Sequence, residues 1–195
     1  MKKLLALAVM FLAVSSYAGI DYGLDAGSTR LGVFGGMSSP VKDWDFGGQS
    51  GTPGQAGGTF GVEFIRNMTP MMAVGFELGY TKYGDKAFNG FDVNSKVFGG
   101  SVLGRINFLP STPTRIYIPF GAGINYFNAE DSAGNSGTST APSLTAGVGI
   151  EFDLSPEFTL GVEGRYTELF LSQSEFHGNN KFSAIDAVVK LGVRF

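Results

Sequence analysis

The chain contains no cysteine, one histidine and one tryptophan among its 195 residues. Without cysteine, thiol catalysis and cysteine-based metal sites are excluded. Charged residues are also scarce, at 16% of the chain, with 14 basic and 17 acidic side chains. Nothing in this balance suggests nucleic acid binding, which requires a clustered basic surface. A phosphate-binding loop is not supported either, because GxxxxGK followed by Ser or Thr does not occur.

The longest apolar run stands at the N-terminus. Lys2 and Lys3 precede the unbroken apolar stretch Leu4–Val14, and small residues precede the expected cleavage after Ala18. This layout predicts a secretory signal peptide at residues 1–18. A transmembrane helix is the alternative, but the 11 residues of the stretch fall well short of the roughly 20 that a helical span requires.

The remaining residues, 19–195, are expected to form one domain. They contain no apolar run of helical span length, which excludes a helical membrane protein. Short proline-bearing turns alternate with longer polar stretches along the domain. The turns are Asn67–Pro70, Leu109–Pro113 and Leu154–Pro156, and the polar stretches are Ser38–Gly57, Gly84–Asp92, Asn128–Thr140 and Phe170–Phe182. Short turns on one side and longer loops on the other are typical of outer-membrane barrels. The Gly/Ser-rich parts of Gly47–Gly58 and Ser132–Thr140 are predicted to be mobile loop.

Eight segments between these connections alternate apolar with polar residues. They are Leu31–Met37, Phe60–Phe64, Met72–Tyr80, Phe98–Phe108, Ile116–Tyr126, Leu144–Phe152, Phe158–Tyr166 and Ile185–Phe195. A period of two predicts strands, and most segments are near the 9–11 residues that cross a bilayer. We therefore predict an all-β, eight-stranded, antiparallel up-and-down transmembrane β-barrel. A soluble sandwich is the alternative, but the polar face carries few of the lysines that solvate an exposed sheet.

Aromatic residues mark the two ends of the expected strands. Outward-facing Phe64, Phe108, Phe152, Phe158 and Phe195 fall beside the short turns or the C-terminus, and outward-facing Tyr80, Tyr126 and Tyr166 fall beside the loops. Two such girdles lie where hydrocarbon meets head groups in membrane barrels.

Several short patterns resemble the small OmpA/OmpX-like outer-membrane β-barrel family. They are the repeated segments Gly61–Phe64, Gly75–Leu78 and Gly161–Gly164, each with a glutamate at its third position, and the ending Lys190–Phe195. The resemblance implies that Val189, Leu191, Val193 and Phe195 form the assembly signal, read by the outer-membrane insertion machinery. The family shares architecture more than activity, so the resemblance leaves function open.

Charges of both signs are expected to face the barrel interior. The predicted set is Arg30, Glu63, Glu77, Arg105, Glu151, Glu163, Arg165, Asp186, Lys190 and Arg194. One hypothesis is a gate or narrow polar pore. The favoured hypothesis is a structural plug of ion pairs, because an eight-stranded barrel is only wide enough for its own side chains and buried charges must be paired. The inward glycines Gly121, Gly123, Gly147 and Gly149 give long arginines room or leave a wet cavity.

No catalytic residue is predicted. The single histidine, His177, resembles the histidine of barrel lipid A deacylases, but Asn179 stands where their serine would be. The acidic pairs around Trp44 and at Glu130–Asp131 could hold a divalent cation through carboxylate oxygens. Solvated loop residues are the favoured interpretation of both pairs, so no metal and no cofactor are expected.

These patterns favour a non-enzymatic outer-membrane barrel that supports envelope integrity, presents surface loops for interaction, or does both. The alternatives are a narrow OmpW-like channel for small or hydrophobic solutes and a lipid A-modifying enzyme. The expected partners are outer-membrane lipids, lipopolysaccharide and the insertion machinery, with no nucleic acid. We expect a monomer in the Gram-negative outer membrane, exported through the periplasm with a cleaved signal peptide.

Overall fold

The structure is a computed structural model that describes residues 24–41, 44–46, 49–51, 55–84, 86–88, 91–131, 136–171 and 181–195. The predicted signal peptide, residues 1–18, and the loop residue His177 lie outside the described residues. Among the described residues no helix is long and apolar enough to span a membrane.

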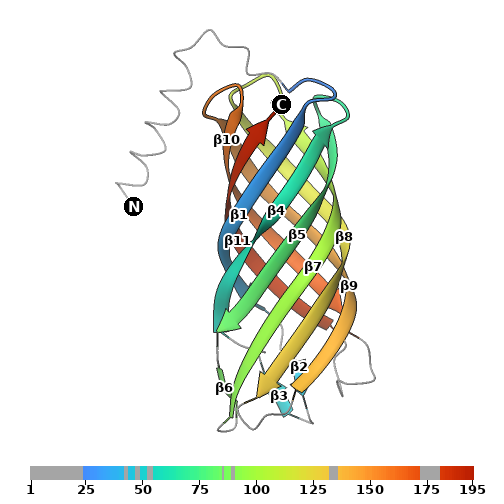
Figure 1. The fold of residues 1–195 in the computed structure, drawn as a ribbon, viewed down its shortest axis with the longest axis vertical. Helices are drawn as coiled ribbons and strands as arrows, with labels where there is room; N and C mark the ends of the chain where they lie inside the picture. Colours follow the sequence, from blue (N-terminus) through green and yellow to red (C-terminus); the bar gives the residue numbers. More distant parts are fainter. Residues whose placement is uncertain are drawn as a thin grey trace, which may run out of the picture.

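Eight long strands form a closed antiparallel barrel (Figure 1). They are β1 (Thr29–Pro40), β4 (Gln55–Asn67), β5 (Met72–Gly84), β7 (Phe91–Phe108), β8 (Thr114–Asp131), β9 (Ser136–Asp153), β10 (Phe158–Phe170) and β11 (Lys181–Arg194). Among the described residues there are also three short strands. Of these, β2 (Trp44–Phe46) pairs with β3 (Gln49–Gly51), and β6 (Lys86–Phe88) pairs with β7. The predicted eight-stranded barrel is confirmed.

The first and last long strands close the barrel. β1 pairs with β11 from Arg30 opposite Arg194 to Pro40 opposite Ala184, and it pairs with β4 on its other side. Each of the eight long strands thus has a paired neighbour on both sides, as a hydrocarbon surrounding requires.

The two ends of the barrel differ. Short turns and the C-terminus lie at one end, at the top of Figure 1, which we call the turn end. At the opposite, loop end, β7, β8 and β9 reach 18 residues each. They project past the shorter β4, β5 and β10 (Figure 1).

The loops predicted from the sequence at this end are longer than those in the structure, because the strands extend into them. Residues 136–140, predicted to be mobile loop, belong to β9, and residues 55–58 belong to β4. The first part of β9 pairs with β8, where Asn128 lies opposite Thr138 and Ala129 opposite Gly137. Ladder hydrogen bonds use backbone groups alone, so a Gly/Ser-rich composition does not prevent this pairing.

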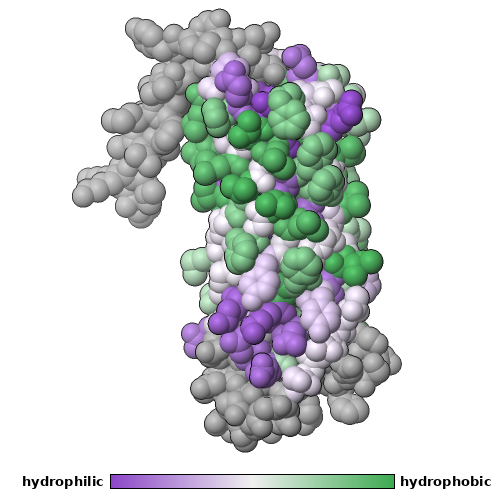
Figure 2. Space-filling model, in the orientation of Figure 1, coloured by the Kyte–Doolittle hydropathy of each residue, from purple (hydrophilic) through white to green (hydrophobic). Residues whose placement is uncertain are grey.

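The outer surface of the barrel carries an apolar band. Leu31, Val102 and Leu191 on three different strands are each more than half exposed. Figure 2 shows a band of hydrophobic side chains across the upper and middle parts of the visible face, with hydrophilic side chains at the rim of the turn end and gathered toward the loop end. From Phe108 to Phe98, β7 rises about 33 Å, which at the usual strand tilt is about 25 Å of height, the thickness of a barrel's apolar band.

The wall between β8 and β9 has one local gap in its ladder. The pairing passes from Tyr117 opposite Gly149 directly to Phe120 opposite Ala146, so Ile118 and Pro119 are unpaired on this side. Proline has no backbone N–H to donate, and the register on either side of the gap is unchanged.

Candidate functional site

The interior of the turn-end half of the barrel is filled by charged side chains. Side chains alternate between the two faces of a strand. Because the apolar positions of the predicted segments are exposed on the outside, their polar positions point inward. Of the predicted inward charges, all are buried except Arg194, which is half-buried.

Nearest the C-terminus, Arg194 and Arg115 share one carboxylate. Arg194 Nη2 lies 2.7 Å from Asp153 Oδ1, and Arg115 Nη1 donates a hydrogen bond of 2.6 Å to Asp153 Oδ2. The Arg115 guanidinium also pairs with Glu151 at 3.0 Å. Arg115 is 0% exposed, so this arginine depends wholly on its protein partners.

Glu151 is the centre of this part of the interior. Its carboxylate pairs with Arg30, with Arg105 at 2.9 Å and with Arg115 at 3.0 Å. The Arg105 guanidinium also lies 3.6 Å from the centre of the Tyr117 ring. One carboxylate on β9 thus contacts arginines from β1, β7 and β8.

A lysine links this region to the middle of the barrel. Arg30 Nη2 lies 2.6 Å from Glu63 Oε1, and the other oxygen of Glu63 accepts a hydrogen bond of 2.9 Å from Lys190. Lys190 Nζ also lies 2.7 Å from Glu163 Oε2. Lys190 therefore joins carboxylates that come from β4 and β10.

Arg165 ends the charged region on the side of the loops. Its Nη1 donates hydrogen bonds of 2.7 and 2.8 Å to the two oxygens of Glu77, and its Nε donates one of 2.9 Å to Asp186. Glu163 lies 3.9 Å from the same guanidinium, which connects Arg165 to Lys190.

Together these contacts make one continuous, branched ion-pair network, in which each contact joins a basic to an acidic side chain. Its members are Arg194, Asp153, Arg115, Glu151, Arg105, Arg30, Glu63, Lys190, Glu163, Arg165, Glu77 and Asp186. Arg115 and Asp153 are not in the set predicted from the sequence. Each lies one residue beyond a predicted segment, at a position that points inward. Extending the alternation by one residue at those ends would therefore have found both.

Small residues make room for the large ones in this interior. A Cβ on Gly149 would overlap the Tyr117 ring, and one on Gly192 would press on the Arg30 side chain. The buried ring of Phe34 lies 4.9 Å from the Arg165 guanidinium. Glycine at 149 thus accommodates a tyrosine, whereas glycine at 192 accommodates an arginine.

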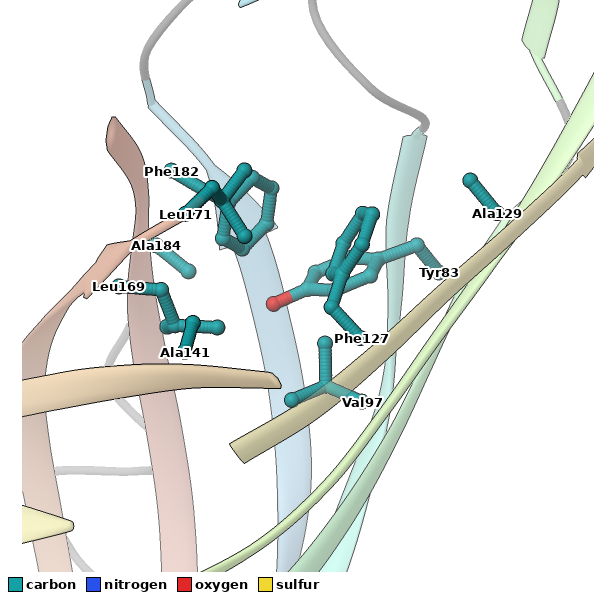
Figure 3. Packing of buried hydrophobic residues seen from close by; sticks show 9 residues of the cluster. All are labelled: Tyr83, Val97, Phe127, Ala129, Ala141, Leu169, Leu171, Phe182 and Ala184. Atoms are coloured by element: carbon teal, nitrogen blue, oxygen red, sulfur yellow. The ribbon is translucent and has the colours of Figure 1, made fainter. Parts of the chain in front are cut away.

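Toward the loop end the interior becomes apolar. An apolar cluster fills it, formed by Tyr83, Val97, Phe127, Ala129, Ala141, Leu169, Leu171, Phe182 and Ala184. Figure 3 shows the Tyr83, Phe127 and Phe182 rings gathered across the barrel, and ring centres lie 5.4 Å apart for Tyr83–Phe182 and 5.5 Å for Phe127–Phe182. The Tyr83 hydroxyl shares a hydrogen bond of 3.1 Å with Ser38. Sequence analysis did not predict this cluster.

A polar cavity of about 60 Å³ separates the apolar cluster from the network. Its lining includes Glu77, Arg165 and Asp186 of the network and Tyr83 and Leu169 of the apolar cluster. Hydroxyl and amide side chains make up much of its wall: Thr59, Thr81, Ser101, Asn125, Ser143, Thr145 and Thr167. A water molecule needs about 10–15 Å³ of such space, so the cavity has room for a few.

The predicted aromatic and assembly-signal residues lie on the outside. Phe108, Tyr126, Phe158, Tyr166 and Phe195 are exposed, and Phe64, Tyr80 and Phe152 are half-buried. Val189, Leu191 and Val193 are also exposed. All of them face away from the interior.

The described residues offer no candidate metal centre. No group of three or more His, Cys, Asp or Glu side chains is placed to hold an ion in the part of the chain that the structure describes. Glu130 is exposed on β8. The side chains around Trp44 and of Asp131, like His177, lie outside the described residues.

Comparison with known families decides which proteins share this architecture. Residues 4–195 match the family model described as "Outer membrane protein beta-barrel domain". The chain belongs to this outer-membrane β-barrel family. The resemblance to small OmpA/OmpX-like barrels is thereby confirmed, while no curated protein matches the chain in sequence.

Solved structures of other outer-membrane barrels have the same fold. Neisserial surface protein A is 16% identical, with a TM-score of 0.62 over 87% of this chain and 99% of that chain. Ail, the attachment invasion locus protein of Yersinia pestis, is 16% identical, with a TM-score of 0.56 over 87% and 99%. OprG of Pseudomonas aeruginosa is 14% identical, with a TM-score of 0.57 over 90% and 99%. At such identities the likeness shows the fold alone.

Proposed function

We propose that this outer-membrane barrel is non-enzymatic, is closed to ions, supports the envelope and presents its loop end to surface partners. The observation that carries the proposal is the continuous ion-pair network across the interior. An ion entering the lumen would have to displace paired charges, and a buried charge that loses its partner is strongly unfavourable.

The apolar cluster supports the same function independently. Tyr83, Phe127 and Phe182 obstruct the lumen between the cavity and the loop end. An ion there would lose its hydration without gaining a polar partner. Two barriers of different chemistry thus stand in series, with the polar cavity between them.

The purified protein should therefore show no stable open-state conductance in a planar bilayer. Single-channel recording is the measurement, with a large porin in the same membrane as the control for insertion and heat-modifiable gel mobility as the control for folding. Stable open-state conductance from the folded, unmodified protein would reject the closed barrel.

A narrow OmpW-like channel is the second candidate, and the polar cavity is the observation that favours it. A hydroxyl-lined space of about 60 Å³ already occupies the middle of the barrel. Conduction would require both the Phe127–Phe182 contact and the Arg165 ion pairs to open. The bilayer recording distinguishes this candidate from the closed barrel.

We also propose that the loop end faces the cell exterior. The chain has no cysteine of its own, so each introduced cysteine reports on one site. Ser136→Cys, at the exposed start of β9, should react with an impermeant thiol reagent on whole cells. Ser111→Cys, exposed in a turn-end connection, should not react until the cells are opened. Labelling of Ser111→Cys on intact cells would show that the turn end, rather than the loop end, faces the cell exterior.

A further inference from the structure

Two lysines face each other on the outside of the barrel near the loop end. Lys82 on β5 lies directly opposite Lys96 on β7. Their strand neighbours Tyr83 and Val97 are buried inside the barrel, so the two lysines point outward. Opposed residues of neighbouring strands have Cβ atoms about 4.5–5.5 Å apart, which brings the two ammonium groups to one small patch.

The patch borders a row of outward aromatic side chains. Tyr80 and Phe98 are opposite each other, two residues nearer the middle of the barrel than the lysines. Phe60 and Tyr126 flank this pair, with Phe60 opposite Tyr80 and Tyr126 opposite Phe98, and the Phe60 and Tyr80 ring centres lie 5.3 Å apart. We call these four residues the aromatic row.

The aromatic row places the lysines at the level of lipid head groups. Aromatic side chains gather where the hydrocarbon of a membrane meets the polar region. Lys82 and Lys96 lie about 7 Å farther along their strands. In Figure 2 the hydrophilic side chains toward the loop end gather just beyond the apolar band, over the loop-side end of β5 and the neighbouring part of β7 as placed in Figure 1.

No carboxylate of the described residues neutralises this pair. Lys181, elsewhere on the outer surface, pairs with Glu168 at 2.9 Å. Lys82 and Lys96 have no such ion pair in the described parts of the chain, and their other cross-strand neighbours are Gly58 and Asn128. The nearest outward acid along β8 is Glu130, two residues farther from the membrane. Like charges directly opposite each other destabilise a sheet, so the pair favours an anion.

We propose that Lys82 and Lys96 bind a phosphate group of an outer-leaflet glycolipid whose acyl chains lie over the aromatic row. Two ammonium groups at one position suit a phosphate, which lysine binds as a point charge. The aromatic row supplies the contact that a lipid makes and a free phosphate ion does not. The neighbouring Asn128 amide offers a neutral donor beside the lysines.

Native mass spectrometry of the folded barrel in detergent, titrated with diphosphoryl lipid A, tests this site. Lys82→Gln combined with Lys96→Gln should weaken lipid binding about thirtyfold, since each lysine near an anionic lipid surface contributes about 1 kcal/mol. Lys82→Arg with Lys96→Arg should bind like the unmodified protein. Lys181→Gln is the matched control and should also leave binding unchanged.

Two further arms separate a lipid from other anions. The same lipid with its phosphates removed should bind the unmodified barrel as weakly as diphosphoryl lipid A binds the double glutamine variant. Inorganic phosphate should not displace bound lipid at comparable concentration. The double glutamine variant should stay folded by heat-modifiable gel mobility, because a repulsive contact is removed.

Three results would overturn the proposal. Equal binding by the double glutamine variant and the unmodified protein would show that the lysines hold no lipid phosphate. An equal loss in Lys181→Gln would show general charge attraction rather than a site. Displacement of the lipid by equimolar inorganic phosphate would show a site for a free anion.

Discussion

Replacing Glu151 by glutamine should lower the free energy of unfolding of the barrel by about 3–5 kcal/mol, the usual cost of breaking a buried ion pair. Glutamine keeps the size of the side chain but removes the charge that Arg30, Arg105 and Arg115 share. Arg105 would then lose its carboxylate partner among the described residues, whereas Arg30 would keep Glu63 and Arg115 would keep Asp153. Urea unfolding in lipid vesicles, followed by heat-modifiable gel mobility, measures the change.

The matched control is Glu157→Gln on the turn between β9 and β10. Glu157 is exposed, and its side chain accepts a hydrogen bond of 3.0 Å from Ser155. Substitutions at such surface positions usually change stability by no more than about 0.5 kcal/mol. Equal stability of the Glu151 and Glu157 variants would mean that solvent, rather than paired carboxylates, neutralises the interior arginines.

Replacing Phe182 by alanine should destabilise the barrel by about 3–5 kcal/mol, because the change leaves a hole in a packed interior. The Phe182 ring is 0% exposed and lies 5.5 Å from Phe127 and 5.4 Å from Tyr83, measured between ring centres. Conductance should remain absent in this variant, because the ion-pair network still closes the lumen. Unfolding in vesicles and bilayer recording check the two halves of this prediction.

Phe120→Ala is the control for this variant. Phe120 is 46% exposed on the outer face of β8, so its removal leaves no interior hole and should cost clearly less. Equal losses in the two variants would show that the apolar cluster is no better packed than the lipid-facing surface. Conductance in Phe182→Ala would show that the cluster is the sole barrier to ions.

The part of the barrel inside the membrane was predictable from the sequence because one rule governs it. Outward residues there are apolar and inward residues are polar, so the alternation around Val162 and Glu163 indicates both the strand and the direction of each side chain. The same parity places Arg165 and Lys190 in the interior. The rule does not give the partner of each charge, because pairing depends on register and on how far each side chain reaches across the lumen.

The loop end escaped prediction because the pattern reverses there. On β8 the outward residues become Asn128 and Glu130, and the inward residues become Phe127 and Ala129. A strand that leaves the membrane needs polar residues toward water and apolar residues toward its own interior, as in a soluble sheet. The expected strand ended at Tyr126, where this reversal begins, and the residues beyond it were assigned to a loop. A search for inverted alternation past the aromatic girdle would find the apolar cluster.

The ion-pair network also has a consequence for how the barrel assembles. The bond between Lys190 and Glu63 joins residues 127 positions apart, and Arg30 from β1 meets Glu151 from β9. A half-inserted sheet would hold these charges unpaired beside hydrocarbon, where each is strongly unfavourable. The step in which β1 pairs with β11 closes the barrel wall and, at the same time, brings the charges of the interior together with their partners. Insertion should therefore be cooperative, with partly inserted species held at low population until the last strand arrives.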